Sequence, residues 1–148
     1  MEIQKDFKEL LKLFNAHKVE YIVVGGYALA FHGAPRYTGD IDILVKPDIE
    51  NAKRALAAIK DFGFGSFNFT ESDFTRTGNV FQLGVPPIRI DIMTSITGVD
   101  WEKANANKIA GQYGGVAVHF LGKKEFIANK KATGRKKDIA DIEAVGED

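Results

Sequence analysis

Hydrophobic residues recur every three or four positions at the start of the chain, which is the spacing of a helix with one buried face. The pattern covers residues 3–16, and its apolar positions are Ile3, Phe7, Leu10, Leu11 and Phe14. A short β-branched run follows at 21–24 and ends at Gly25 and Gly26, which predicts a buried strand that enters a tight turn. The pattern is helical again over 27–32 and then stops at a Gly-Ala-Pro sequence.

Two later segments alternate with a period of two, which predicts strands. They are residues 40–45 and 88–93. Asp40 and Asp42 lie on one face of the first strand, opposite two isoleucines. In the second strand Asp91 shares a face with Arg89, opposite the inward isoleucines. Each strand therefore presents carboxylates on a single face.

Glycines and prolines divide the rest of the chain into short elements. The pattern predicts a helix over 49–62, one or two strands within 64–84, a hairpin around Gly114 and Gly115, and two helices over 123–133 and 136–145. This order implies an α/β or α+β fold, with a mixed β-sheet flanked by helices. Residues 1–148 have the size of a single domain. Within it we expect the opening helix at 3–16, a core segment at about 20–95, and the hairpin and C-terminal helices at about 108–146.

The composition excludes several classes of protein. The sequence has no cysteine, so any metal must be bound through oxygen or histidine. Twenty basic residues balance twenty acidic ones, which argues against binding nucleic acid through bulk charge alone. No apolar run approaches the roughly 20 residues that span a bilayer, and the N-terminus lacks the basic start of a signal peptide. We therefore expect a cytoplasmic protein without a membrane partner.

The paired aspartates are candidates for metal chemistry. Asp40 and Asp42 project from the same strand face, so their carboxylates can converge on one hard cation. If the strand of Asp91 pairs beside theirs, three carboxylates meet on that face. At about 4 Å each like-charged pair repels by roughly 4 kcal/mol in a partly buried setting, and a bound divalent cation removes this cost. The alternative is an exposed strand face that carries aspartates for solubility, and the glycine pair is likewise either a phosphate cradle or a plain turn.

The ordered combination of these features resembles the nucleotidyltransferase superfamily typified by DNA polymerase beta. Its members carry Gly-Gly or Gly-Ser at a helix start, Asp-x-Asp on the following strand and a third carboxylate on a later strand. More narrowly, residues 20–142 are similar to small bacterial and archaeal members, including nucleotidyltransferase toxins of abortive-infection systems. The matching segments are Gly25-Gly26-Tyr27-Ala28, His32-Gly33, Arg36-x-Thr38-x-Asp40-Ile41-Asp42 and Lys130-x-x-x-Gly134-Arg135-x-Lys137-Asp138-x-x-Asp141.

The resemblance implies a catalytic and metal-binding role for each acidic position. Asp40 and Asp42 would hold two Mg²⁺ ions, with Mn²⁺ as an alternative. Asp91 would bind the second ion and help to deprotonate the attacking hydroxyl.

Other positions of the matching segments are candidate nucleotide or phosphate contacts. They are Gly25, Gly26, Tyr27, Arg36, Thr38, Lys130, Arg135 and Lys137. The two glycines would let backbone N–H groups face the outer phosphates. Structural roles stay open for the side chains, because Arg36 can form a salt bridge, Thr38 can cap its turn, and the basic run can be a solvated face. Asp138 and Asp141 are expected to orient the nearby bases rather than to bind metal.

Together these features predict a magnesium-dependent nucleotidyltransferase. It would move a nucleoside monophosphate from a nucleoside triphosphate to an acceptor hydroxyl and release pyrophosphate. The acceptor is left open between RNA, protein and a small molecule, and the candidate protein partners are a second copy of the chain, another subunit or a cognate antitoxin. Two alternatives stay open: a nucleotide-binding regulatory module without turnover, and a toxin that modifies tRNA or protein.

Overall fold

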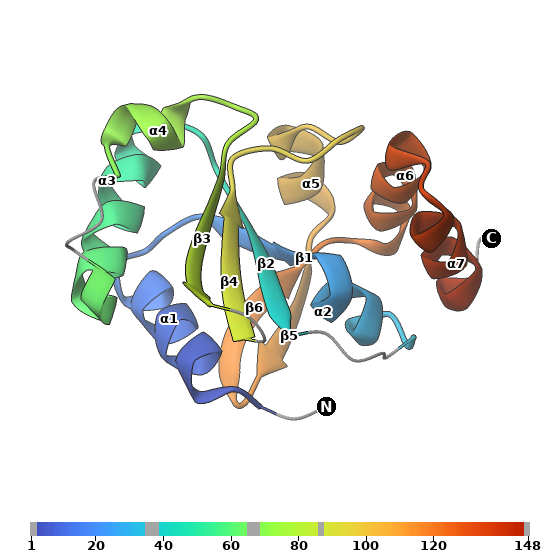
Figure 1. The fold of residues 1–148 in the computed structure, drawn as a ribbon, viewed down its shortest axis with the longest axis horizontal. Coiled ribbons are helices and arrows are strands. Elements are labelled where there is room, and N and C mark those ends of the chain that lie inside the picture. Colours follow the sequence, from blue (N-terminus) through green and yellow to red (C-terminus); the bar gives the residue numbers. More distant parts are fainter. Residues whose placement is uncertain (1–2, 35–38, 65–68, 86–87, 147–148) are drawn as a thin grey trace.

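One mixed β-sheet organises the protein in its computed structural model (Figure 1), which describes residues 3–34, 39–64, 69–85 and 88–146. Its strands are β1 (Tyr21–Val24), β2 (Asp40–Val45), β3 (Val80–Val85), β4 (Ile88–Met93), β5 (Ile109–Tyr113) and β6 (Val116–Phe120). Their order across the sheet is β3-β4-β2-β1-β6-β5. The predicted fold class, a mixed sheet flanked by helices, is confirmed.

Helices cover both faces of this sheet. They are α1 (Lys5–Ala16), α2 (Gly25–Phe31), α3 (Ile49–Ile59), α4 (Glu71–Thr75), α5 (Trp101–Asn107), α6 (Lys123–Thr133) and α7 (Lys136–Val145). Figure 1 shows α1 and α3 on one side of the sheet and α5, α6 and α7 on the other. In the part of the chain that the structure describes, no helix is long and apolar enough to cross a membrane.

In the centre of the sheet, β2 has one antiparallel and one parallel neighbour. β2 is antiparallel to β1 on one side and parallel to β4 on the other. Ile41 and Ile43 of β2 are almost fully buried in the core, so Asp40 and Asp42 point to the opposite side of the sheet. The strand directions therefore assign one face of β2 to the core and the other to polar residues.

The ends of three predicted helices need correction. α2, expected over 27–32, begins at Gly25 and ends at Phe31. α1 begins at Lys5, and Ile3 precedes the helix with 46% of its surface exposed. α3 ends at Ile59 and continues into a kinked π-helical turn, η1 (Lys60–Phe64), in which Gly63 has a φ of 108°. The predicted helix over 49–62 is therefore present, but its last turn is not α-helical.

Two short helices were not predicted. α4 occupies part of the segment where strands were expected, and among the described residues of that segment β3 from Val80 onward is the only strand. It begins with a capping box in which Thr70 and Asp73 each accept a hydrogen bond from the other's backbone N–H. α5 begins at Asp100, whose side chain accepts from the backbone N–H of Lys103. Both helices are too short to show a helical hydrophobic period.

Candidate active site

The pairing of β2 with β4 brings the three predicted acidic residues together. The two strands are parallel, with Asp42 opposite Asp91 and Asp40 opposite Arg89. Because side chains two residues apart share a face, all three aspartates project to the same side of the sheet. The condition under which the three carboxylates meet, that the strand of Asp91 pairs beside that of Asp40, is therefore met.

The three aspartates line a cleft of about 610 Å³ between the sheet and the C-terminal helices. Several predicted phosphate contacts line the same cleft: Gly25, Gly26, Lys130, Arg135 and Lys137. The volume lies within the range of about 300–1,000 Å³ that is typical of small-ligand sites. The fold therefore joins the front and back halves of the sequence motif in one space.

Asp42 sits where negative charge is most concentrated on this face. Burial, followed by the charges of Asp91 and Asp40, raises the pKa of Asp42 to about 6, while Lys130 acts in the opposite direction. Asp42 and Asp91 also lie within hydrogen-bonding reach of each other. Two carboxylates this close are stabilised by a shared proton or by a cation between their oxygens.

Arg89 is part of this acid cluster, although the sequence analysis gave it no role. Its Nε donates to Asp91 Oδ1 at 2.8 Å, and its Nη2 donates to Asp40 Oδ2 at 2.8 Å and to Asp91 Oδ2 at 3.2 Å. The signal that could have identified it is its position two residues before Asp91, on the same strand face. Its guanidinium offsets part of the negative charge.

Gly25 allows the start of α2 to approach the acid cluster. Its φ of +66° lies in the left-handed region that favours glycine. A Cβ atom at this position would overlap the carboxylate of Asp42. A side chain at Gly25 would therefore displace Asp42, which explains why the turn needs glycine.

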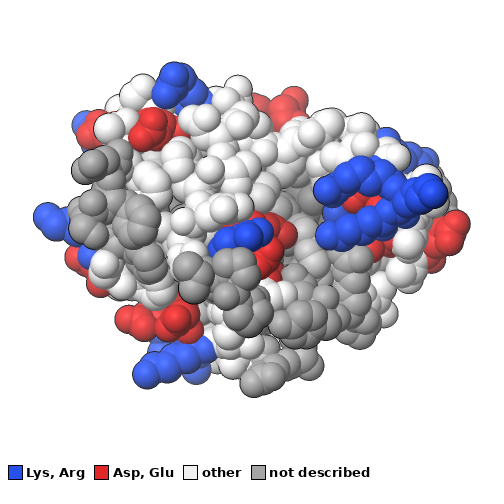
Figure 2. Space-filling view, viewed as in Figure 1, with Lys and Arg blue, Asp and Glu red and all other residues white. Residues whose placement is uncertain are grey.

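Two buried aspartates on α7 hold the basic end of the cleft. Asp138 is fully buried, accepts a hydrogen bond from Arg135 Nε at 2.8 Å and pairs with Lys130 at 3.3 Å. The Arg135 hydrogen bond holds the pKa of Asp138 well below its usual range. Asp141 pairs with Lys130 at 3.6 Å. These ion pairs confirm that Asp138 and Asp141 orient the bases, which Figure 2 shows gathered over the side of α6 and α7.

The remaining predicted contacts are not in the cleft or fall outside the described residues. Tyr27 is buried, and its ring packs edge-on against Phe7 and Tyr113 at centroid distances of 5.8 and 5.5 Å. α2 therefore directs this side chain into the core, which corrects the prediction that it contacts phosphate. Arg36 and Thr38 lie outside the described residues.

The oxygen-only set of donors fits a hard divalent cation such as Mg²⁺. Among the described residues, however, no three acidic or histidine side chains form a ready set of metal ligands. Arg89 Nη2 instead joins Asp40 to Asp91. Metal binding by the three aspartates stays a prediction.

Comparison with known proteins assigns the sequence to a family. The sequence matches the family described as "Nucleotidyltransferase of unknown function (DUF6036)" over residues 1–146. Curated proteins gave no significant sequence match. Solved structures with a similar fold include TM1012 from Thermotoga maritima, a nucleotidyltransferase candidate, with 18% identity and a TM-score of 0.63 over 96% of this chain and 93% of that one.

Two antibiotic-resistance proteins share the fold as well. The lincosamide antibiotic adenylyltransferase LnuA, bound to lincomycin, has 13% identity and a TM-score of 0.57 over 98% of both chains. The antibiotic-resistance factor ANT(2'')-Ia has 14% identity and a TM-score of 0.62 over 95% of this chain and 80% of that one. At these identities the structures show the fold alone, whereas the sequence match covers nearly the whole chain. The chain belongs to the DUF6036 family of nucleotidyltransferases.

Proposed function

We propose that the protein is a divalent-metal-dependent enzyme that transfers a nucleoside monophosphate from a nucleoside triphosphate to an acceptor hydroxyl. The observation that carries the proposal is the register of β2 on β4, which sets Asp42 opposite Asp91 beside Asp40 in a cleft with a basic end. Adenylyl transfer by LnuA, which shares the fold, supports this class of reaction.

Asp40, Asp42 and Asp91 would hold Mg²⁺, which supplies charge neutralisation at the α-phosphate and the leaving group. The acceptor oxygen forms a bond to the α-phosphorus while the bond from that phosphorus to the bridging oxygen breaks, and pyrophosphate leaves with the electron pair. Asp91 takes the proton of the acceptor hydroxyl.

The basic end of the cleft suits the triphosphate. Lys130 is 8% exposed and held by two aspartates, so its ammonium is fixed at the cleft wall with little entropy left to lose on binding. Arg135 and Lys137 line the same wall and would contact the outer phosphates. Gly25 and Gly26 expose backbone rather than side chains to the cleft, which lets a phosphate approach closely.

A nucleotide-binding module without turnover is a second candidate, because Arg89 already joins two of the three carboxylates. One experiment distinguishes the enzyme from the non-catalytic module. Purified protein is incubated with Mg²⁺ or Mn²⁺ and each of four α-labelled nucleoside triphosphates, together with total RNA, cell-extract protein or small metabolites. The enzyme releases pyrophosphate and labels one acceptor fraction.

The variant Asp42→Asn should abolish both signals. Asp61→Asn is the matched control, because Asp61 of η1 is exposed, pairs with His17 and does not line the cleft. Triphosphate binding without pyrophosphate release in any fraction would support the non-catalytic module instead.

A further inference from the structure

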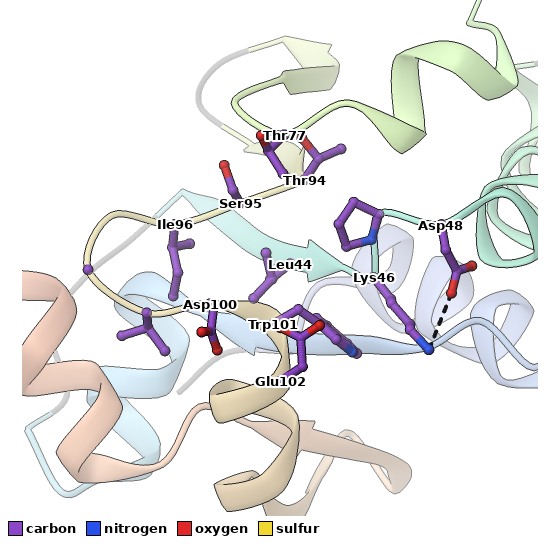
Figure 3. A pocket seen from close by; sticks show the side chains of 13 residues that line it. Leu44, Lys46, Asp48, Thr77, Thr94, Ser95, Ile96, Asp100, Trp101 and Glu102 are labelled. Atoms are coloured by element: carbon purple, nitrogen blue, oxygen red, sulfur yellow. Dashed lines mark ion pairs between the residues drawn. The ribbon is translucent and has the colours of Figure 1, made fainter.

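A second pocket adjoins the active-site cleft on the same face of the sheet (Figure 3). This side pocket has a volume of about 570 Å³ and lies between the end of β2, the segment after β4 and the start of α5. Ser95 and Ile96 line both spaces, so the two adjoin at these residues. Leu44 in the side pocket follows Asp42 by two residues on one strand face, about 7 Å along the strand. A molecule bound there can extend a group to the acid cluster.

Trp101 gives the side pocket an aromatic wall with an unused hydrogen-bond donor. The residue is only 9% exposed, and Figure 3 shows its indole ring extending from α5 across the pocket. Among the residues that the structure describes, no acceptor bonds its indole N–H. The indole N–H is therefore available to donate to an acceptor atom of a ligand in the pocket. Thr77 and Ser95 add hydroxyl groups to the opposite wall.

The charges of the side pocket favour a cation. Three carboxylates and one ammonium line it, and the ammonium of Lys46 already pairs with Asp48 at 3.2 Å. Asp100 accepts a hydrogen bond from the backbone N–H of Lys103, but within the described ranges no basic side chain pairs with Asp100 or with Glu102. The pocket therefore attracts an amine and repels a phosphate backbone.

We propose that the side pocket binds the acceptor, and that this acceptor is a small molecule bearing amine and hydroxyl groups. The inference rests on the proposed function, since an acceptor exists only if transfer occurs. The ammonium would lie between Asp100 and Glu102 beside the ring of Trp101, where a cation–π contact adds to the ion pairs. A hydroxyl of the same molecule would extend past Ser95 to the α-phosphate. An RNA acceptor would meet like charge here.

Trp101 is the only tryptophan of the chain, so its fluorescence reports on the side pocket directly. The probes are the disaccharide of glucosamine, which carries two amines, and its N-acetylated counterpart, which has the same ring scaffold without charge. Titrated without triphosphate or metal, the amine form should change the fluorescence with a Kd at least about ten-fold lower than the neutral form. Calorimetry of the same titration provides a second measurement.

The double variant Asp100→Asn, Glu102→Gln should lose this ten-fold preference. Asn at position 100 keeps a side-chain oxygen for the cap of α5, so the helix is retained. Glu9→Gln on the exposed face of α1 is the matched control and should behave as wild type. Three outcomes would overturn the proposal. The neutral sugar could bind as tightly as the amine form, the preference for the amine form could survive in the double variant, or the fluorescence could respond to adenosine or a short RNA instead. Because the titration needs no triphosphate, its failure alongside intact pyrophosphate release would remove this inference and leave the proposed function standing.

Discussion

Two groups of charged side chains face one cleft under opposite electrostatic conditions. On β2 and β4, three carboxylates are opposed by one guanidinium, and burial raises the pKa of Asp42 to about 6. On α7, the hydrogen bond from Arg135 and the ion pair with Lys130 hold the pKa of Asp138 well below its usual range. An ionised aspartate therefore lowers the stability of the fold in the first group and raises it in the second. The unbalanced group is the one available for chemistry, because only it gains by binding a cation.

Replacing Asp42 should have the largest effect. Asp42→Asn removes a proposed metal ligand, so we expect nucleotide transfer to fall by at least about 10³-fold, which corresponds to about 4 kcal/mol. The same change removes a buried charge, so at pH 8 the free energy of unfolding should rise by about 2–3 kcal/mol. Rate assays and urea denaturation measure the two effects.

The gain in stability should depend on pH with a defined sign. The folded-state pKa of about 6 lies above the unfolded value, so wild-type protein binds this proton more tightly when folded. Wild-type stability should therefore fall as the pH rises from about 4 to 6 through this group, and the advantage of Asp42→Asn should vanish near pH 4. An advantage that is equal at pH 4 and pH 8 would contradict the account.

Asp138→Asn should have the opposite effect on stability. It leaves Lys130 with one fewer partner in a buried site, so we expect a loss of about 3 kcal/mol in the free energy of unfolding at pH 7. The pKa of Asp138 is lowered on folding, so its contribution is present above the unfolded pKa and is lost as the pH falls toward the lower folded value. Urea denaturation of Asp138→Asn beside Glu143→Gln, an exposed change on the same helix, tests this; equal stabilities would show that the network is not structural.

The sequence was sufficient to assign each acid to a strand face, because the face depends on strand periodicity alone. Asp40 and Asp42 share a face by their spacing, and a parallel neighbour strand suffices to add Asp91. The direction and order of the strands were not predictable, since they depend on long-range pairing of β2 with β4, in which each residue pairs with one 49 positions later, as Asp42 does with Asp91. Thus the prediction that the acids meet was conditional on a pairing that only the structure shows.

Where the sequence failed, tertiary packing decided the outcome. Tyr27 directly follows the glycine pair, so it was expected to contact phosphate. The direction of α2 instead places its ring against Phe7 in the core. Arg89 lies on the same strand face as Asp91, but an arginine on a strand can pair with any nearby acid. Its partners became known only from the register, which places it opposite Asp40. α5 was missed because its seven residues contain too few turns for periodicity, although Asp100 was a visible capping signal.

Gly25→Ala should separate backbone strain from damage to the acid cluster. Gly25 and Gly33 both have positive φ, so alanine at either position should cost about 1–2 kcal/mol of stability, measured by denaturation. Only at Gly25 does the new Cβ overlap the carboxylate of Asp42, since no atom of the described residues lies within 4 Å of the corresponding atom at Gly33. Nucleotide transfer should therefore fall in Gly25→Ala and persist in Gly33→Ala. Loss of transfer in both variants would trace the defect to the fold rather than to Asp42.

Arg89→Gln tests whether the guanidinium stands in for a metal ion. Arg89 pairs with Asp40 and Asp91 in this structure, so it would compete with a cation for these carboxylates. Removing the competitor should tighten Mn²⁺ binding by about ten-fold, or about 1.4 kcal/mol, in calorimetry at low ionic strength. Arg76→Gln is the control, because Arg76 is 69% exposed and pairs with Asp73 away from the cleft. Weaker Mn²⁺ binding in Arg89→Gln would instead mean that Arg89 orients the carboxylates for the ion. Arg89 would then be part of the metal site on β2 and β4 rather than a competitor of the metal ion.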